Sequence, residues 1–359
     1  MDKKSRILML TPDYPPMRGG VARYLSALAR HLKDQVVVIA GTHPEWQTFD
    51  PQESYPIYRM PLLYKRFWPR WLKTLRYVRS VRKQYDLVIT SHVIPIGTAV
   101  MCSKIPYIVF VHGMDIRLAK QSARKRRVAQ KVLSRARLVV ANSEALAREV
   151  HADFGVSSLV VYPCLESIPE TVQKKSDVFS LLTVSRLVER KGHARVLTAL
   201  ARLRRSGKLS AFEYHIAGTG PMEATLRTMT HELGLEDLVV FHGDVSQDDL
   251  EKLYADADVF VEPVSNDKID KEGFGMVFIE AAAYATPSIT SNISGVNEAV
   301  LDNETGLLID PEDPNALSSA ILTLALDTEL RERLGQQARA RAKSMFQCNA
   351  QFAKLEPYL

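Results

Sequence analysis

Short runs of branched and other apolar residues alternate with longer amphipathic stretches along the whole chain. Apolar runs of this length, rich in valine, isoleucine and leucine, are typical of strands buried on both faces of a parallel sheet. In the first half they are ILML, VVVIA, DLVIT, YIVFV, RLVVA and LVVY, and in the second half FSLLTVS, FEYHIA, LVVFH, DVFVE, PSITS and GLLID. The segments between them predict helices near 20–33, 68–84, 94–103, 117–135 and 143–154, and then near 192–205, 221–233, 247–256, 276–285, 296–301 and 314–326.

This regular alternation of strand and helix predicts an α/β protein with two doubly wound, Rossmann-like domains. Residues 163–177 carry two prolines and several charges but no periodic pattern, so they are predicted to form the linker. We therefore expect an N-terminal domain over 1–163 and a C-terminal domain over 164–345. The last segment, 346–359, is predicted to be helical and to cross back onto the first domain.

Composition narrows the possible classes of protein. With 359 residues, of which 46% are hydrophobic, the chain can bury two cores of ordinary size. Its three cysteines are odd in number and far apart, which favours neither a disulfide framework nor a zinc site and fits a reducing cytoplasm. No apolar run approaches the length of a membrane span or a signal sequence. The net charge of +6 is compatible with anionic partners.

The stretch EGFGMVFIE, residues 272–280, stands out in the second half. Glycines at 273 and 275 allow a tight turn, and Met276 is predicted to begin a helix whose free N–H groups suit a phosphate. Glu272 precedes this turn, and Glu280 lies about two helical turns after it. Two carboxylates at this spacing could contact sugar hydroxyls and ribose hydroxyls. The alternative is an ordinary glycine turn followed by a helix with a solvated Glu280.

Ligands of doubly wound sheets bind at the carboxyl ends of the strands, where several polar and glycine residues fall in this chain. In the first half these are Gly19 and Gly20, which precede a helix, and His112. A lone histidine is more often structural, but a His–Gly pair at a strand end suits a side chain that points into a cleft.

In the second half, cationic and glycine residues follow successive strands. Arg186 and Lys191 are two cations suited to a diphosphate, although a solvated basic loop is the plainer interpretation. Gly218 lies in a second turn where backbone can approach closely. Gly243 and Val245 follow the next strand, where a nucleobase could lie against the backbone.

A set of short motifs, in this order along the chain, resembles the motifs of family 4 glycosyltransferases. They are GG near the start, HG at 112, SRLVERKG at 185–192, AGTGP at 217–221, HGDVS at 242–246 and EGFGMVFIEA at 272–281. The resemblance spans nearly the whole chain and is strongest in the second half. It implies the GT-B fold, in which two such domains face each other across a cleft. It also implies a retaining, metal-independent hexosyltransferase without a cofactor, whose donor is a nucleotide sugar. The acceptor would be a glycan or a lipid-linked molecule of cell-envelope synthesis.

The same resemblance implies a role for individual residues. Arg186 and Lys191 would bind the donor diphosphate, and Glu280 the ribose. Glu272 would hold the transferred hexose. The remaining donor-binding residues would be Gly19, Gly20, Gly218, Gly243, Val245, Phe274, Gly275, Met276 and Val277, with His112 near the reacting carbon. GDP-mannose is slightly favoured over UDP-sugars, partly because of the charged run 267–271.

Two other classes remain open at this stage. A nucleotide-sugar epimerase or a sugar phosphorylase can also use paired doubly wound domains, although a phosphorylase would be much longer. A non-catalytic, basic, peripheral membrane-binding protein is the other alternative. Nucleic acid is the least favoured partner because no RNA-binding or helix-turn-helix signature is present.

The membrane alternative rests on residues 64–85, which contain many cations and no acid. Apolar residues recur at helical spacing within this stretch, so a helix that packs on its own sheet is predicted in any case. The excess charge is not needed for packing and suits an anionic lipid surface. We expect the enzyme to dock on the inner face of the plasma membrane through Arg70, Lys73, Arg76 and Lys83.

Overall fold

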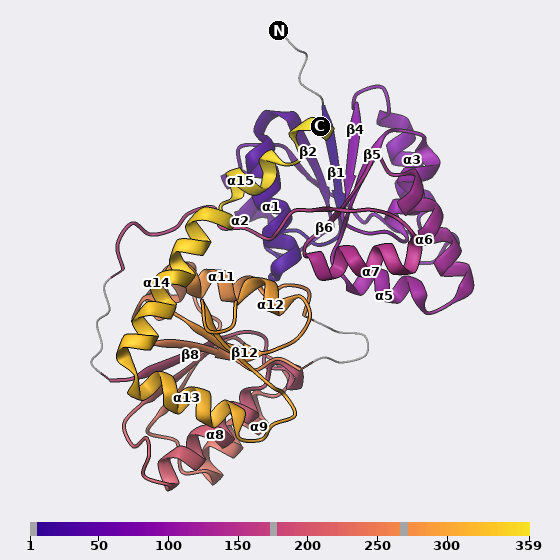
Figure 1. The fold of residues 1–359 in the computed structure, drawn as a ribbon. Coiled ribbons are helices and arrows are strands. Elements are labelled where there is room, and N and C mark those ends of the chain that lie inside the picture. The colour runs from indigo at the N-terminus through magenta and orange to yellow at the C-terminus, as the bar shows by residue number, and fades with distance from the viewer. Residues whose placement is uncertain (1–5, 173–177, 266–271) are drawn as a thin grey trace. The chain divides into compact units, whose positions relative to one another are not determined.

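The computed structural model describes residues 6–172, 178–265 and 272–359. The chain divides into two compact units, Met1–Glu166 together with Cys348–Leu359, and Ser167–Gln347. Each unit contains one parallel sheet with helices on both faces, which confirms the predicted α/β class and the two Rossmann-like domains (Figure 1).

The sheet of the first unit has seven parallel strands in the order β3-β2-β1-β4-β5-β6-β7. The central strands are fully buried and consist almost wholly of branched and other apolar residues, as strands covered on both faces require. Their bounds are β1 Ile7–Thr11, β2 Val36–Ala40, β3 Ile57–Arg59, β4 Leu87–Thr90, β5 Tyr107–Val111, β6 Leu138–Ala141 and β7 Leu159–Val160.

Helices cover this sheet on two sides. One side packs α1 (Gly20–Leu32) and α15 (Cys348–Ala353) over the core that contains Tyr24 and Phe110. The other side packs helices such as α3 and α6 over the core that contains Val78 and Val132 (Figure 1). The remaining bounds are α2 Trp46–Phe49, α3 Leu72–Val81, α4 Ile96–Ser103, α5 Met114–Lys120, α6 Ala123–Arg135 and α7 Glu144–Phe154.

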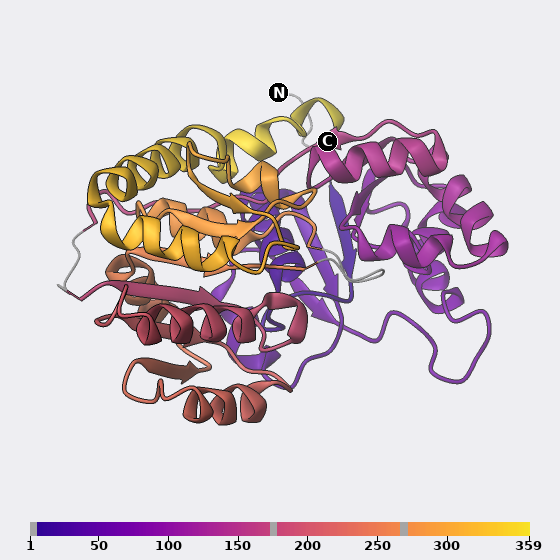
Figure 2. The same cartoon turned by 60° about the horizontal axis from the view of Figure 1, so that its bottom comes forward.

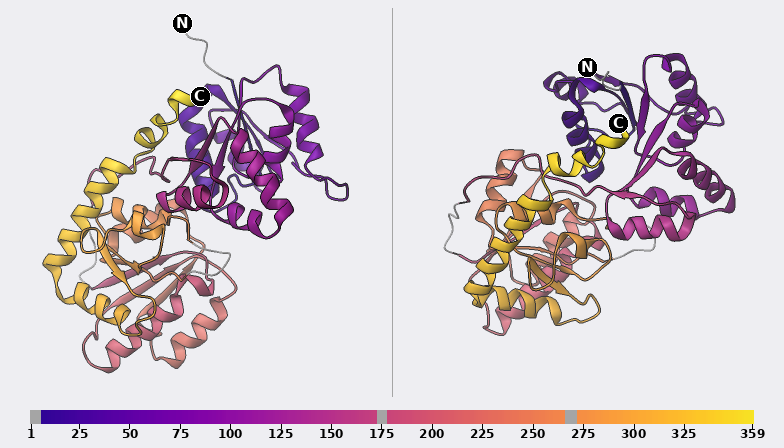
Figure 3. Two further views of the ribbon diagram at one scale, coloured as in Figure 1. Left: turned by 45° about the vertical axis from the view of Figure 1, so that its right-hand side comes forward. Right: turned by 45° about the horizontal axis from the view of Figure 1, so that its top comes forward.

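The C-terminal segment belongs to the first unit. Helix α15, at the yellow end of the chain, lies beside the indigo helix α1 (Figure 3). Phe352 is fully buried, and the Gln351 side-chain oxygen accepts a hydrogen bond from the Tyr162 backbone N–H at 2.9 Å. A disulfide joins Cys164 to Cys348. The expectation of no disulfide was therefore wrong, because only the return of the chain brings two cysteines 184 residues apart into contact.

The sheet of the second unit has six parallel strands in the order β10-β9-β8-β11-β12-β13. Helices α11 and α12 cover one face, while α8, α9 and α13 cover the other (Figures 1 and 2). The strands are β8 Ser180–Val184, β9 Glu213–Ala217, β10 Val239–Gly243, β11 Val259–Glu262, β12 Ser288–Ser291 and β13 Gly306–Ile309. The helices are α8 His193–Arg205, α9 Glu223–Glu232, α10 Gln247–Asp256, α11 Met276–Ala283, α12 Val296–Ala299, α13 Ala316–Leu326 and α14 Thr328–Met345.

The structure differs from the sequence-based expectation in three elements. The short strand β3 and the short helix α2 were missed, because neither has enough residues to establish a period. The single helix expected over 117–135 is two helices, α5 and α6. Ser122 ends the continuous pattern because its side chain caps α6, accepting a hydrogen bond from the Lys125 backbone N–H at 3.2 Å.

Candidate functional site

In the second sheet the strand order reverses between β8 and β11, and this is the point where ligands of such sheets bind. Arg186 lies just beyond the end of β8 and is exposed, and Lys191 follows in a short 3₁₀ helix, Glu189–Lys191. Glu262 is the last residue of β11. The predicted cations therefore lie at the switch point of the sheet, beside a carboxylate that the sequence analysis did not single out.

Lys191 is the centre of a buried ionic cluster. Its Nζ lies 2.7 Å from Glu262 Oε1 and 2.7 Å from Glu272 Oε2. Arg190 Nη1 lies 2.9 Å from the same Glu272 oxygen. Glu262 is fully buried and Lys191 is 8% exposed. Two cations thus face two carboxylates, so Lys191 is already ion-paired before any ligand binds.

The cluster shifts the ionisation of its members. Burial would raise the pKa of Glu272, but the charges of Lys191 and Arg190 outweigh burial and hold that pKa at about 2. Burial would lower the pKa of Lys191, but the carboxylates Glu262 and Glu272 raise it instead. Burial raises the pKa of Glu262, while the Lys191 charge opposes that rise. Glu272 and Lys191 therefore stay ionised around neutral pH.

Close backbone approaches hold the cluster in place. Gly192, directly after Lys191, has a positive φ of 78°, and a Cβ there would lie 2.5 Å from the Pro263 carbonyl oxygen, just beyond β11. Gly218 has φ of 132°, and its Cβ would lie 2.0 Å from the Ser185 carbonyl oxygen. Only glycine fits both positions, because a side chain would separate the loops that follow β8, β9 and β11.

Helix α11 begins at Met276, as predicted, after the turn that follows Glu272. Gly275 caps it in the left-handed region with φ of 87°, and Met276 and Val277 form its first turn. The N–H groups of a first turn have no partner within their own helix, so they suit an anion. Phe274 is 2% exposed and packs against Phe346, which fixes the turn to α14.

Glu280 is buried on α11 rather than solvated. It is 5% exposed, and its Oε2 accepts a hydrogen bond of 2.9 Å from the Tyr254 hydroxyl. The Tyr254 ring stacks on Tyr284 at 5.7 Å. The plain alternative of an exposed Glu280 is therefore wrong, while its predicted contact with ribose stays a prediction.

The loop after β10 is the predicted nucleobase site. Gly243 has φ of 63°, and its carbonyl oxygen accepts a 2.7 Å hydrogen bond from the Gly218 N–H. Val245 is half-buried beside it, and Ser246 caps α10 by accepting from the Asp249 N–H at 3.2 Å. The loops that carry Gly218 and Gly243 are thus joined by main-chain hydrogen bonding.

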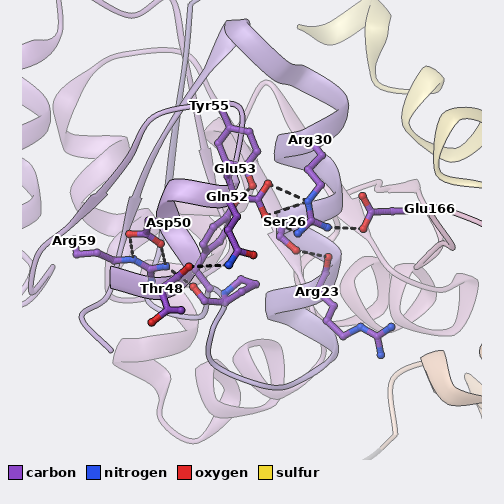
Figure 4. A network of polar contacts seen from close by, with 12 residues as sticks. Arg23, Ser26, Arg30, Thr48, Asp50, Gln52, Glu53, Tyr55, Arg59 and Glu166 are labelled. Carbon is purple, nitrogen blue, oxygen red and sulfur yellow. Dashed lines mark hydrogen bonds and ion pairs between the residues drawn. The ribbon is translucent and has the colours of Figure 1, made fainter. Parts of the chain in front are cut away.

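In the first unit, Gly19 caps α1 with φ of 142°, and Gly20 is the first residue of that helix. The loop before them is anchored by Arg59, at the end of β3 (Figure 4). Arg59 Nη2 lies 2.6 Å from Asp50 Oδ1 and also donates to the Pro15 carbonyl oxygen. The Arg59 side chain is only 4% exposed. Strand β3, which the sequence analysis missed, therefore supplies the residue that anchors the loop before Gly19 and Gly20.

His112 follows β5, and its ring nitrogen Nε2 is buried without a hydrogen-bond partner in the described part of the chain. Burial, with a smaller effect of His92, lowers its pKa to about 3, so the ring is neutral at physiological pH. The backbone N–H of His112 donates to Asp115 Oδ1 at 3.0 Å. The ring is therefore a buried, neutral imidazole, and its predicted place near the reacting carbon stays a prediction.

The four cations predicted to bind membrane lie on and beside α3. Arg70, Arg76 and Lys83 are exposed, while Lys73 is half-buried. Leu75 and Val78 are buried beneath them, which confirms the packed apolar side of the helix. None of the described helices is long and apolar enough to cross a bilayer.

Sequence reasoning missed Glu262, Arg190 and Arg59 as contributors to these loops. Glu262 was part of a strand-like run, although a carboxylate at a buried strand end is the signal that could have found it. The charged run 267–271, used above to favour GDP-mannose, lies outside the described residues.

Two Rossmann-like domains with parallel sheets in one chain are the architecture of GT-B glycosyltransferases. A family model described as "Glycosyltransferase Family 4" matches residues 18–165, and one described as "Glycosyl transferases group 1" matches residues 166–341. The chain belongs to the family 4 glycosyltransferases. It is therefore an enzyme of the transferase class, which decides against the epimerase and the non-catalytic binding protein.

Similar proteins support the same assignment. A GDP-mannose-dependent alpha-(1-6)-phosphatidylinositol monomannoside mannosyltransferase of Mycobacterium tuberculosis is 26% identical over 99% of this chain and 98% of that protein. A GDP-mannose-dependent enzyme of Corynebacterium glutamicum that acts on the monoacylated form is 25% identical over 96% and 95%. The structure of Anabaena HepE in complex with UDP and glucose matches with a TM-score of 0.80 and 22% identity over 99% of this chain and 100% of that one. The last likeness concerns the fold.

Proposed function

We propose that the protein transfers a hexose from a nucleotide sugar to a hydroxyl group of a glycolipid acceptor, with retention of configuration and without a metal ion. The observation that carries this proposal is the cluster of Lys191, Arg190 and Glu272 beside the N-terminus of α11. It brings fixed cations, the N-terminal turn of a helix and one ionised carboxylate together at the switch point of the second sheet.

The donor would lie along the carboxyl edge of this sheet. Its diphosphate would take the remaining N–H of Lys191, the guanidinium of Arg186 and the first turn of α11. Glu272, held ionised, would accept hydrogen bonds from hexose hydroxyls. The ribose would reach Glu280, and the base would lie against Gly243 and Val245.

The reaction breaks the bond between the anomeric carbon and the phosphate oxygen of the donor. A new bond forms on the same face of the sugar between that carbon and the acceptor oxygen, while the acceptor proton passes to the leaving diphosphate. Negative charge grows on the diphosphate as the bond breaks, so Lys191, Arg186 and the helix N-terminus stabilise the transition state more than the ground state. A second carboxylate is not needed in this route, because the leaving phosphate acts as the base.

Two residues of the first unit, Gly20 and His112, are assigned to donor binding and to catalysis by the family resemblance alone, and both assignments stay predictions. His112 is neutral, since burial lowers its pKa to about 3. A neutral imidazole can exchange a hydrogen bond with a sugar hydroxyl without adding a positive charge next to a developing oxocarbenium centre.

GDP-mannose is the donor we favour. The relatives of Mycobacterium tuberculosis and Corynebacterium glutamicum described above match almost the full chain, and both are named as GDP-mannose-dependent mannosyltransferases of phosphatidylinositol monomannosides. A thermal-shift panel of GDP-mannose, GDP, UDP-glucose, UDP-galactose and UDP-N-acetylglucosamine in EDTA tests donor class and metal independence together. We expect the guanosine nucleotides to raise Tm most. Stabilisation by uridine nucleotides alone would mean that the donor is a UDP-sugar rather than GDP-mannose. Stabilisation by none of the nucleotides, with or without Mg²⁺, would refute nucleotide-sugar binding.

Attachment to an anionic membrane would bring the enzyme to a lipid-linked acceptor, on the cytoplasmic leaflet where nucleotide sugars are present. Phe67 and Trp68, just before α3, are 52% and 73% exposed. On the same side of the sheet, α6 adds exposed cations, among them Arg124, Arg126 and Arg127. Exposed aromatics beside a field of cations suit the headgroup boundary, where each cation contributes about 1 kcal/mol.

Liposome co-sedimentation tests this attachment. Binding should require anionic lipid and fall steeply as salt increases, and it should weaken when Arg70, Lys73, Arg76 and Lys83 are replaced by Gln. A matched variant with four cations of the second unit changed to Gln, Arg202, Arg204, Arg205 and Lys208, should pellet like the wild type. Equal binding to neutral lipid, or no binding to anionic lipid at low salt, would favour an acceptor in solution.

A further inference from the structure

The fully buried Glu262 has no assigned part in the transfer reaction, yet it touches the cation expected to bind the donor. Its Oε1 accepts from Lys191 Nζ at 2.7 Å, and its Oε2 has no hydrogen-bond partner among the described residues. It ends β11, next to β8 at the switch point. A buried carboxylate is costly unless its charge is compensated, and here the compensation comes from Lys191.

Lys191 has three N–H donors, and two of them are already used by Glu262 and Glu272. One N–H remains for a phosphate oxygen, so the two carboxylates fix its direction. A phosphate oxygen at ordinary hydrogen-bond distance from the ammonium would then lie about 4.5 Å from the Glu262 carboxylate oxygen that Lys191 contacts. At that distance the carboxylate repels a diphosphate appreciably in a poorly solvated site.

We propose that Glu262 is a positioning residue of the donor site that orients Lys191 and, through its negative charge, limits how tightly the site holds a nucleoside diphosphate. This inference rests on the proposed function. The ammonium can stabilise the charge that grows on the leaving diphosphate, while the opposing carboxylate speeds release of the nucleoside diphosphate product. The positioning role therefore acts through Lys191, and Glu262 itself does not touch the substrate.

The charge of Glu262 depends on its neighbours. Lys191 and Arg190 face it as cations, and Glu272 faces it as an anion. Tyr214 on β9 is neutral, because burial raises its pKa. Burial raises the pKa of Glu262 as well, so lowering the pH protonates this carboxyl before it affects Glu272. Protonation removes the repulsion, and donor affinity then increases as pH falls.

The test compares Glu262→Gln with the wild type by titration calorimetry, using GDP-mannose and UDP-glucose between pH 6 and pH 8.5. Their phosphates carry constant charge over this range. The amide keeps an oxygen that can accept from Lys191 but removes the charge. We expect the variant to bind the donor at least about tenfold more tightly at high pH. Its KM and kcat should both fall, because product leaves more slowly.

The wild type provides a second measurement that needs no variant. Its donor affinity should increase where lowering the pH protonates Glu262, toward that of Glu262→Gln, whose own affinity should be flat. Asp258→Asn is the matched control, because Asp258 is a buried carboxylate at the opposite end of β11 that pairs with Arg331 at 3.3 Å. This control should lower Tm without changing donor affinity.

Equal or weaker donor binding by Glu262→Gln, or the same tightening in Asp258→Asn, would overturn the inference. A wild-type affinity that falls as pH is lowered, while that of Glu262→Gln stays flat, would also contradict it. These failures differ from failure of the proposed function, in which the wild type itself binds no nucleotide sugar and the inference falls with it.

Discussion

Replacing Lys191 with methionine should destabilise the second unit strongly, although it retains a side chain of similar length. The substitution leaves Glu262 fully buried and opposite Glu272 without the cation between them. Removing one partner of a buried ion pair typically costs about 3 to 5 kcal/mol. For a domain of this size that corresponds to a decrease in Tm of roughly 6 to 20 °C.

The pH dependence of the loss identifies its cause. Without Lys191, burial of Glu262 is unopposed, and its folded-state pKa lies further above the unfolded value. A raised carboxyl pKa favours the folded state at low pH and costs stability as pH rises through the folded pKa. The difference between Lys191→Met and the wild type should therefore be small near pH 4.5 and largest above neutrality.

Urea denaturation of wild type, Lys191→Met, Glu262→Gln and the double variant forms the assay. The double variant should recover most of the lost stability, because the uncompensated charge is gone. Lys191→Met as stable as the wild type at pH 8, or a double variant no more stable than Lys191→Met, would refute the view that Glu262 and Lys191 form a mutually dependent pair.

Three further predictions concern individual residues. Gly275→Ala should weaken donor binding and cost at least about 1 to 2 kcal/mol in urea denaturation, because φ is 87° and a Cβ would lie 2.5 Å from the Phe278 ring. The control Gly155→Ala, with φ of 63° and open space around it, should leave donor binding unchanged, and an equal loss of donor binding in both variants would contradict the packing argument. The stabilisation due to Glu272, whose pKa is about 2, should be present above pH 4.5 and lost as pH falls toward 2. In urea denaturation, the free energy of unfolding of Glu272→Gln should therefore decrease less with falling pH than that of the wild type, and identical pH dependence would contradict the ion pairing. Arg59→Met should destabilise the first unit by about 3 to 5 kcal/mol because it leaves the buried carboxylate of Asp50 unpaired, and unchanged urea denaturation would contradict that.

The sequence predicts the architecture well because buried parallel strands have a distinctive composition. All the strands predicted from runs of branched and other apolar residues are present in the structure. Strand β3, Ile57–Arg59, was missed because it has too few residues and too mixed a pattern to be recognised. Positions at strand ends were also predictable, since Lys191 and Glu272 meet at one edge of the sheet.

Pairings between distant segments could not be read from the pattern. Glu262 reads as the polar end of a strand, and its contact with Lys191 depends on β8 and β11 being neighbours. The disulfide between Cys164 and Cys348 depends on the return of the C-terminal helix to the first unit. Such contacts follow from topology, which spacing along one chain does not specify.

The most direct test of the account is transfer of radiolabelled mannose from GDP-mannose to a phosphatidylinositol-containing lipid extract in the presence of EDTA, with wild type and Glu272→Gln compared. The account predicts labelled glycolipid from the wild type and a rate at least about a hundredfold lower from the variant, because the carboxylate that orients the hexose is lost. Transfer by Glu272→Gln at the rate of the wild type would contradict the site, and no transfer from any nucleotide sugar, with or without a metal ion, would contradict the function.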